Sequence, residues 1–128
     1  RIAKKLPVSV PSHCALMQPA VAALSKGLTA IPFSTPSIPV IHNTDVLPKT
    51  EPQAIRDILA CQLTEPVRWV ETIQYMQGAG IVSYVECGPG KVLRGLNKRI
   101  ISGNTTFCIN TPILFAETQQ QMKEHIDE

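Results

Sequence analysis

The segment 81–109 constrains the fold most, because it reads as a strand, a tight turn, a helix and a second strand. Residues 81–87 are rich in Val and Tyr, which favour strands, and a Gly-Pro-Gly sequence at 88–90 ends that run. Apolar residues then recur at helical spacing across 91–101, and a second short strand is predicted over 105–109. Two strands connected through a helix normally lie parallel in one sheet. We therefore predict an α/β fold with a mostly parallel sheet and flanking helices.

Proline positions and apolar spacing predict the other elements. They are a strand over 6–10, a helix over 18–29 with Pro19 in its first turn, a buried strand over 38–41, a helix from Thr50 to about 63, a second helix that begins near Thr64 and stops at Gly78, and a terminal helix over 115–126. Thr50 is expected to cap its helix, with Gln53 as its capping-box partner. With 128 residues, of which 44% are hydrophobic, the chain is long enough for one globular unit.

Charge and hydropathy exclude two classes of partner. The net charge of +2 is too close to neutral to indicate binding to nucleic acid. No apolar run approaches the roughly 20 residues that span a bilayer, and no signal-like segment follows Arg1. We therefore expect a soluble, cytoplasmic protein with no membrane partner, and a chain cut from a longer one.

Cysteine and histidine spacing gives no sign of a metal site or a disulfide framework. The cysteines form no CxxC pair, and the histidines are far apart in sequence, with no HExxH motif. We expect buried, reduced thiols and neither a metal nor a cofactor. The residues in question are Cys14, Cys61, Cys87, Cys108, His13, His42 and His125.

His13 is the candidate general base, because it follows the first predicted strand in the sequence VSVPSHCALM. Catalytic groups collect at the carboxyl ends of strands in α/β proteins, and a neutral imidazole can take a proton from a serine or thiol. Its neighbours Ser12 and Cys14 are unsuited as its nucleophile, because adjacent side chains diverge. The chain also lacks a GxSxG elbow, so it holds a base without a nucleophile. The alternative is a structural or surface histidine.

Gln62 places a polar side chain on the apolar stripe of the helix that follows Thr50. It lies at i+7 from Ile55, on the side of Ile58 and Leu59. Burying an unpaired amide costs roughly 1–3 kcal/mol, so Gln62 should bond a neighbour or line a site. If the last helical turn is frayed, the side chain instead reaches water.

The helix after the Gly-Pro-Gly turn carries a basic side. Lys91, Arg94 and Lys98 lie at i, i+3 and i+7, and Arg99 extends the positive side. A solvated helix face is one explanation, and recognition of an acidic partner protein is the other. The GPGK sequence departs from both nucleotide-binding loop patterns, so we interpret it as a tight strand-to-helix turn rather than a phosphate loop.

Three motifs in this order resemble the carboxyl-terminal part of the malonyl-CoA:acyl-carrier-protein transacylases of bacterial type II fatty acid synthesis. They are VPSHCALM from Val10, QLTEPVRW from Gln62 and ECGPGKVLRGLNKRI from Glu86. The resemblance covers nearly the whole chain up to Asn110, and the tail after Pro112 stays unassigned.

The resemblance implies an acyltransferase that acts on malonyl-CoA and acyl carrier protein. In that family a serine in a GHSxG elbow takes the malonyl group and passes it to the phosphopantetheine thiol. His13 matches the histidine that activates the serine and then the thiol, and Gln62 matches the glutamine whose backbone carbonyl orients that imidazole. Ser12 matches a position linked to the choice between malonyl and methylmalonyl units. The basic residues expected to contact the acidic carrier protein are Lys91, Arg94, Lys98 and Arg99.

The resemblance also implies a division of the chain. The family fold is an α/β-hydrolase-like large subdomain with a ferredoxin-like insertion. Residues 1–10 match the last strand of the insertion, and residues 11–128 match the carboxyl-terminal part of the large subdomain. The family's serine, malonate-binding arginine and oxyanion-hole donors would lie upstream, so the chain alone is expected to be inactive.

Two other functions stay open from the residues alone. One is a non-catalytic α/β module that binds an acidic partner protein through the basic helix. The other is a thiol enzyme that uses Cys61 or Cys87.

Overall fold

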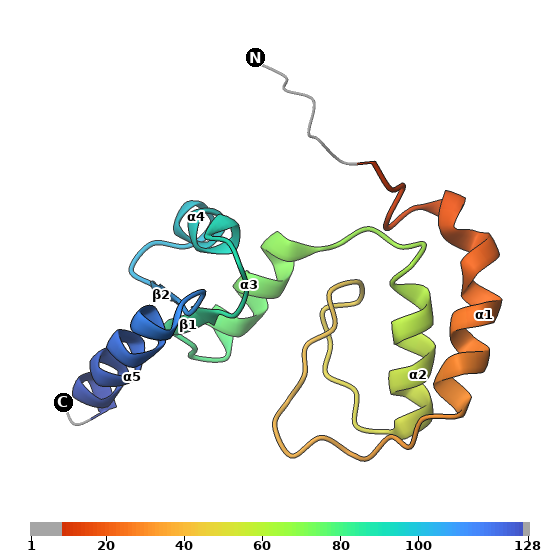
Figure 1. Ribbon diagram of the computed structural model, residues 1–128, viewed down its shortest axis with the longest axis horizontal. Helices are drawn as coiled ribbons and strands as arrows, with labels where there is room; N and C mark the ends of the chain where they lie inside the picture. Colours follow the sequence, from red (N-terminus) through yellow and green to blue (C-terminus); the bar gives the residue numbers. More distant parts are fainter. Residues whose placement is uncertain (1–8, 127–128) are drawn as a thin grey trace. The chain divides into compact units, whose positions relative to one another are not determined.

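A computed structural model describes residues 9–126, with side chains up to residue 124 (Figure 1). The predicted strand over 6–10 falls largely outside this range. The described chain forms two compact units, of which the first ends at Thr72 and the second begins at Ile73. Within residues 9–126, no helix has the length and apolar character needed to cross a membrane.

The first unit is built on two helices that lie side by side, α1 (Gln18–Thr29) and α2 (Pro52–Cys61) (Figure 1). α1 has the predicted bounds, and Pro19 lies in its first turn, where a missing N–H breaks no helical hydrogen bond. On α2, Arg56 donates from Nε to the Leu28 carbonyl at 3.1 Å. This contact ties the end of α1 to α2.

The segment before α2 is an irregular connection, so the predicted buried strand over 38–41 is wrong. Ile38 is 75% exposed, and Ile41 forms only an isolated antiparallel bridge with Pro48. The physical reason lies in Pro39, which has no N–H to donate to a strand ladder.

α2 begins at Pro52, and the predicted Thr50 capping box is wrong. The residue before a proline is pushed out of the helical region, so Glu51 has φ −76° and ψ 129° and takes the N-cap position. Gln53 therefore bonds forward along the helix, with its Nε2 donating to Asp57 Oδ1 at 2.8 Å.

α3 (Trp69–Gly78) begins later than the sequence predicts and ends where predicted. Thr64 closes α2 instead of opening α3, because its N–H donates to the Cys61 carbonyl at 3.1 Å and its Oγ1 to the same oxygen at 3.3 Å. The boundary between the two units falls within α3, next to Ile73, which is only 1% exposed.

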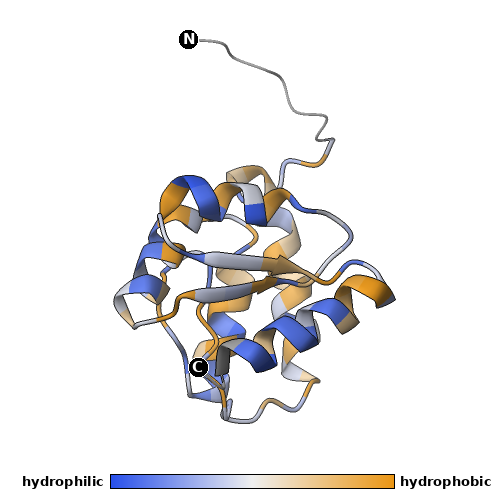
Figure 2. Ribbon diagram, turned by 90° about the vertical axis from the view of Figure 1, so that its left-hand side faces the viewer, coloured by the Kyte–Doolittle hydropathy of each residue, from blue (hydrophilic) through white to orange (hydrophobic). Residues whose placement is uncertain are grey.

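The second unit contains the predicted strand–helix–strand arrangement. β1 (Ser83–Glu86) and β2 (Thr105–Cys108) are joined through α4 (Val92–Ile100) and pair in parallel, with Ser83 opposite Thr105 (Figure 2). α4 and the terminal helix α5 (Pro112–Ile126) both pack against β2. The prediction of an α/β fold with a parallel sheet and helices is confirmed for this pair of strands.

α5 begins at Pro112, three residues before the predicted start at 115. Thr111 supplies the cap, because its Oγ1 accepts the N–H of Leu114 at 3.2 Å. The Thr-Pro pair is a helix-start signal that apolar spacing alone misses.

Side chains of the strands alternate in burial, as expected for one covered face. Tyr84 and Glu86 of β1 are buried, as are Thr106 and Cys108 of β2. On α4 the fully buried residue is Asn97, whose Nδ2 donates to Thr106 Oγ1 at 3.4 Å. The helices carry both hydrophobic and hydrophilic residues, as Figure 2 shows in orange and blue.

Candidate functional site

His13 lies at a sharp turn of the backbone. Its φ of 59° is in the left-handed region, which a residue with a Cβ seldom adopts. On one side the N–H of Ser12 donates to the Val10 carbonyl at 2.9 Å, and on the other Cys14 begins the short 3-10 helix Ala15–Met17. Such backbone conformations are found preferentially at functional sites. The ring is exposed, so it is accessible to a reacting group.

The His13 ring is oriented by the end of α2. Its Nδ1 lies 2.7 Å from the backbone carbonyl oxygen of Gln62, which is 49 positions away in sequence. A carbonyl can only accept, so His13 Nδ1 carries a proton, and in the neutral ring Nε2 then holds the lone pair. An imidazole in this tautomer can accept a proton at Nε2.

Gln62 offers that carbonyl because it is the C-cap of α2. Its own N–H still donates to the Ile58 carbonyl at 3.0 Å, but the carbonyls of the last helical turn have no partner within the helix. The sequence pattern had singled out the Gln62 side chain, whereas the contact with His13 uses its backbone oxygen. The contact is the one that the resemblance implies, and the catalytic role of both residues stays a prediction.

The Gln62 side chain bonds a neighbour, which is the first of the two alternatives derived from the sequence. Its Nε2 lies 3.5 Å from Nδ1 of His42, a long hydrogen bond. His42 is 5% exposed, and burial lowers the pKa of its imidazole more than the nearby Asp45 raises it. Sequence reasoning missed His42, because it sits among turn-forming residues with no periodic signal.

The free backbone N–H groups at the start of α4, which could bind an anion, are occupied by a carboxylate of the protein itself. Glu86 accepts the backbone N–H of Leu93 at 3.1 Å and that of Arg94 at 2.9 Å. The N–H of Arg94, and next that of Leu93, hold the pKa of this carboxyl below its ordinary value, although its burial acts in the opposite direction. This arrangement supports the interpretation of GPGK as a tight turn rather than a phosphate loop. In the sequence, the feature that could have predicted this contact is an acidic residue shortly before the Gly-Pro-Gly turn.

The predicted basic residues are all exposed on or beside α4. Two of them, Lys91 and Arg94, line a pocket of about 310 Å³ together with β2 and the α5 residues Glu117 and Gln121. Glu117 brings an opposite charge into this pocket, so it is mixed in character rather than purely cationic. The full basic set, with side chains in solvent, is Lys91, Arg94, Lys98 and Arg99.

The cysteines are free thiols, but the prediction that they are buried is wrong for two of them. Cys108 is buried and Cys14 half-buried, whereas Cys61 and Cys87 are exposed. Cys87 follows Glu86, whose side chain faces the interior, so strand alternation points the next side chain outward. Among the described residues, no group of three His, Cys, Asp or Glu side chains is placed to hold a metal ion.

Ser12 is exposed and adjoins His13, as the sequence requires. The structure brings His13, Gln62 and His42 together through the two hydrogen bonds of Gln62. The basic residues of α4 belong to the second unit.

Similarity to known proteins agrees with the motifs. No protein-family model matches the chain. The malonyl CoA-acyl carrier protein transacylase of Escherichia coli (strain K12) is 49% identical over 111 residues, which are 87% of this chain and 36% of that protein. The protein of the same name from Bacillus subtilis (strain 168) is 36% identical over 122 residues, 95% of this chain and 38% of that one. The chain thus spans little more than a third of the length of these two relatives.

Solved structures show the same likeness. The malonyl CoA-acyl carrier protein transacylase of Coxiella burnetii is 47% identical with a TM-score of 0.86, covering 92% of this chain and 37% of that one. A malonyl-transacylase solved in complex with a type II polyketide acyl-carrier protein is 44% identical with a TM-score of 0.81, covering 85% and 35%. These likenesses confirm the resemblance drawn from the three motifs: over most of its length, the chain is homologous to a segment of the malonyl CoA-acyl carrier protein transacylases.

Proposed function

We propose that this chain is the carboxyl-terminal part of an enzyme that transfers a malonyl group from coenzyme A to the phosphopantetheine thiol of acyl carrier protein. The observation that carries the proposal is the 2.7 Å contact between His13 Nδ1 and the Gln62 carbonyl, which leaves Nε2 able to accept a proton. The homology to transacylases supports the choice of substrate and acceptor.

In this proposal His13 accepts one proton and then donates it again in each half of the reaction. Nε2 takes the proton of a serine hydroxyl as that oxygen attacks the thioester carbonyl of malonyl-CoA. The imidazolium then returns the proton to the coenzyme A sulfur as the carbon–sulfur bond breaks, which leaves a malonyl-serine ester. In the second half Nε2 takes the proton of the carrier-protein thiol as its sulfur attacks the ester carbonyl. The imidazolium then gives that proton to the serine oxygen as the ester bond breaks, which leaves the malonyl group on the carrier-protein sulfur as a thioester.

The Gln62 carbonyl serves this cycle by fixing the ring and by stabilising its positive charge. It carries a dipole rather than the full negative charge of the aspartate in many serine hydrolases, so it orients His13 without pairing it as an ion. The serine would come from residues outside this chain.

We further propose the division that the resemblance implies. Residues 11–128 would form part of an α/β-hydrolase-like large subdomain, and residues 1–10 the last strand of a ferredoxin-like insertion. Ser12, exposed next to His13, would face the malonyl group and influence the choice of extender unit. Lys91, Arg94, Lys98 and Arg99 would meet the acidic carrier protein, for which their exposure is a requirement.

The test replaces His13 in a protein that joins this chain to the upstream part found in the relatives. His13→Ala should reduce malonyl transfer to carrier protein by about 10³-fold or more, the scale of losing a general base together with its nucleophile's activation. A mass-detected malonyl-enzyme should no longer accumulate. Transfer that survives in a folded His13→Ala protein would refute the proposal, as would a malonyl adduct formed on the 128-residue chain alone.

A further inference from the structure

We propose that His42 is a positioning residue for His13 that acts through the side chain of Gln62. The inference rests on the function proposed for His13. Gln62 contacts both histidines. Its backbone carbonyl oxygen lies 2.7 Å from His13 Nδ1, and its side-chain Nε2 lies 3.5 Å from His42 Nδ1. The residue that orients the candidate base is therefore itself held by a second histidine.

The His42 ring is suited to accept from an amide. It is 5% exposed, and burial in the protein lowers its pKa, so the neutral ring dominates at neutral pH. An N–H of the Gln62 amide can only donate, which assigns the lone pair to His42 Nδ1 and the proton to Nε2. That Nε2 is buried with no hydrogen-bond partner among the described residues, so within this part of the chain the ring is held by its contact with Gln62.

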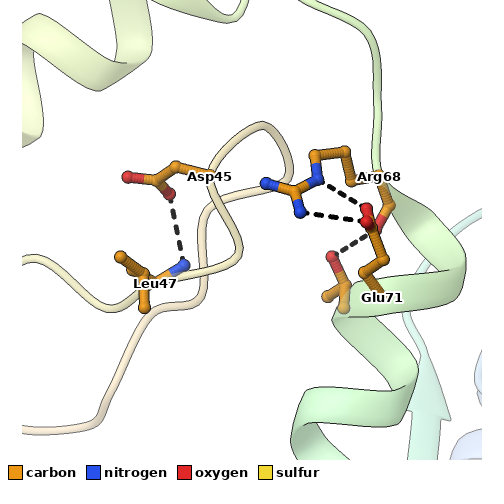
Figure 3. Close-up of polar contacts among 5 residues, drawn as sticks. Asp45, Leu47, Arg68 and Glu71 are labelled. Atoms are coloured by element: carbon orange, nitrogen blue, oxygen red, sulfur yellow. Dashed lines mark hydrogen bonds and ion pairs between the residues drawn. The ribbon is translucent and has the colours of Figure 1, made fainter.

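The backbone around His42 is fixed by its own turn. The N–H of His42 donates to the Leu47 carbonyl at 3.3 Å, and the His42 carbonyl accepts the N–H of Val46 at 3.0 Å. Asp45 Oδ1 accepts the N–H of Leu47 at 3.2 Å (Figure 3), and the other carboxylate oxygen, Oδ2, pairs with Lys49 Nζ at 2.6 Å. His42 is thus carried by a segment with several internal hydrogen bonds, as an anchor requires.

The same turn is tied to the chain that enters α3. The N–H of Arg68 donates to the Asn43 carbonyl at 2.7 Å, and the Arg68 guanidinium pairs with Glu71 on the first turn of α3 (Figure 3). In sequence, the end of α2 lies between these two segments, and it is closed by turn hydrogen bonds such as that from Leu63 N to the Ala60 carbonyl at 3.3 Å. The hydrogen bond from the Gln62 side chain to His42 therefore restrains Gln62 at the position where α2 ends.

The test separates positioning from mere packing by changing one acceptor atom. In the protein with its upstream part, His42→Asn keeps an acceptor near the position of Nδ1, and His42→Leu removes it. We expect His42→Leu to lower kcat for malonyl transfer about three- to tenfold, while KM for malonyl-CoA stays unchanged. A loss of this size is typical when a substituted residue influences a site without touching its ligand. His42→Asn should restore most of kcat.

A second variant approaches the contact from the other side. Gln62→Met removes the amide and keeps the backbone carbonyl, so it should lower kcat as His42→Leu does. The double variant should be no slower than either single one, because both remove the same contact. Gln53→Met makes the same change earlier on α2, where the exposed amide donates to Asp57, so it is the matched control and should leave kcat unchanged.

Three outcomes would overturn the inference. They are unchanged kcat in His42→Leu and Gln62→Met proteins that melt like the parent, equal losses in His42→Asn and His42→Leu, and additive losses in the double variant. If His42→Leu fails to fold, Gln62→Met and the pair His42→Asn and His42→Gln still decide, because glutamine places its amide near Nε2 instead. Activity that survives His13→Ala would instead refute the proposed function, so the two failures are distinguishable.

Discussion

The Glu86 carboxylate accepts the backbone N–H of Arg94 at 2.9 Å, although eight positions separate the two residues. A second oxygen of the same carboxylate accepts the N–H of Leu93 at 3.1 Å. Both N–H groups belong to the first turn of α4, where the helix has no internal partner for them and where its dipole favours negative charge. The turn at 88–90 is therefore closed by a side chain of the preceding strand.

Removing the Glu86 carboxylate should open the first turn of α4. In Glu86→Ala the N–H groups of Leu93 and Arg94 lose their acceptors, so their hydrogen exchange, followed by NMR, should be faster than in the parent chain. Glu86→Gln, which keeps one acceptor oxygen, should lie between the two. Glu117→Ala on α5 is the control and should leave these amides unchanged; equal exchange in the parent and Glu86→Ala would contradict the capping role.

The pH dependence of this contact has a definite sign. The pKa of Glu86 is held below its ordinary value, first by the N–H of Arg94, so the folded state favours the ionised carboxylate. Its stabilisation is present above the unfolded pKa of about 4.3 and is lost as pH falls through the lower, folded pKa. The difference in urea-unfolding free energy between the parent chain and Glu86→Gln should therefore shrink toward low pH. A difference that grows under acid conditions would contradict this assignment.

Local patterns predicted the elements that local rules control. Pro19 and the apolar spacing after it are enough to place α1, and the Gly-Pro-Gly turn is enough to order β1 and α4. The errors arose where two local rules competed. At Glu51 the restriction imposed by Pro52 outweighed the capping preference of Thr50, and Pro39 broke a run that hydrophobicity alone assigned to a strand.

The site could be predicted only in part from the residues. The contact of His13 with Gln62 joins residues 49 positions apart, so no periodicity within one element reports it, and only the family resemblance implied it. His42 was missed for the same reason: its partner is 20 positions away, and its burial comes from tertiary packing.

Arg56 should contribute to the stability of the first unit. Its guanidinium donates to the carbonyls of Leu28 and Ile31, both at 3.1 Å, and lies 4.9 Å from the ring centre of Phe33. Arg56→Met keeps the aliphatic packing but loses these interactions, so the free energy of unfolding should fall by about 1–3 kcal/mol. Urea unfolding followed through the single tryptophan, Trp69, measures it.

Two variants on α2 bracket the role of Arg56. Arg56→Lys keeps the charge but cannot span both carbonyls with the same fork, so it should lose part of the stability. Asp57→Ala, which removes only an exposed contact with Gln53, should stay within about 0.5 kcal/mol of the parent. A drop of equal size in Asp57→Ala and Arg56→Met would contradict a specific role for the guanidinium.

Charge reversal on α4 tests the carrier-protein surface. In the protein with its upstream part, Arg94→Glu combined with Lys98→Glu should raise KM for acyl carrier protein by roughly tenfold at low salt and weaken its salt dependence. KM for malonyl-CoA should stay the same. Lys26→Glu combined with Lys123→Glu, at exposed lysines of α1 and α5, is the charge-matched control. Unchanged KM and salt dependence in the double variant would remove these residues from the interface.

The buried ring of His42 should titrate below the ordinary histidine range. Desolvation lowers its pKa; Asp45 raises it and Lys49 lowers it further, each by a smaller amount. NMR titration of the ring protons should therefore give a midpoint under the unperturbed value of about 6.5. Because the unfolded chain binds this proton more tightly, the ring's neutral form stabilises the fold above that value, and the stability falls as pH drops through the folded pKa. Lys49→Met should move the midpoint up and Asp45→Asn should move it down, and shifts in the opposite directions would show that these charges do not act on His42.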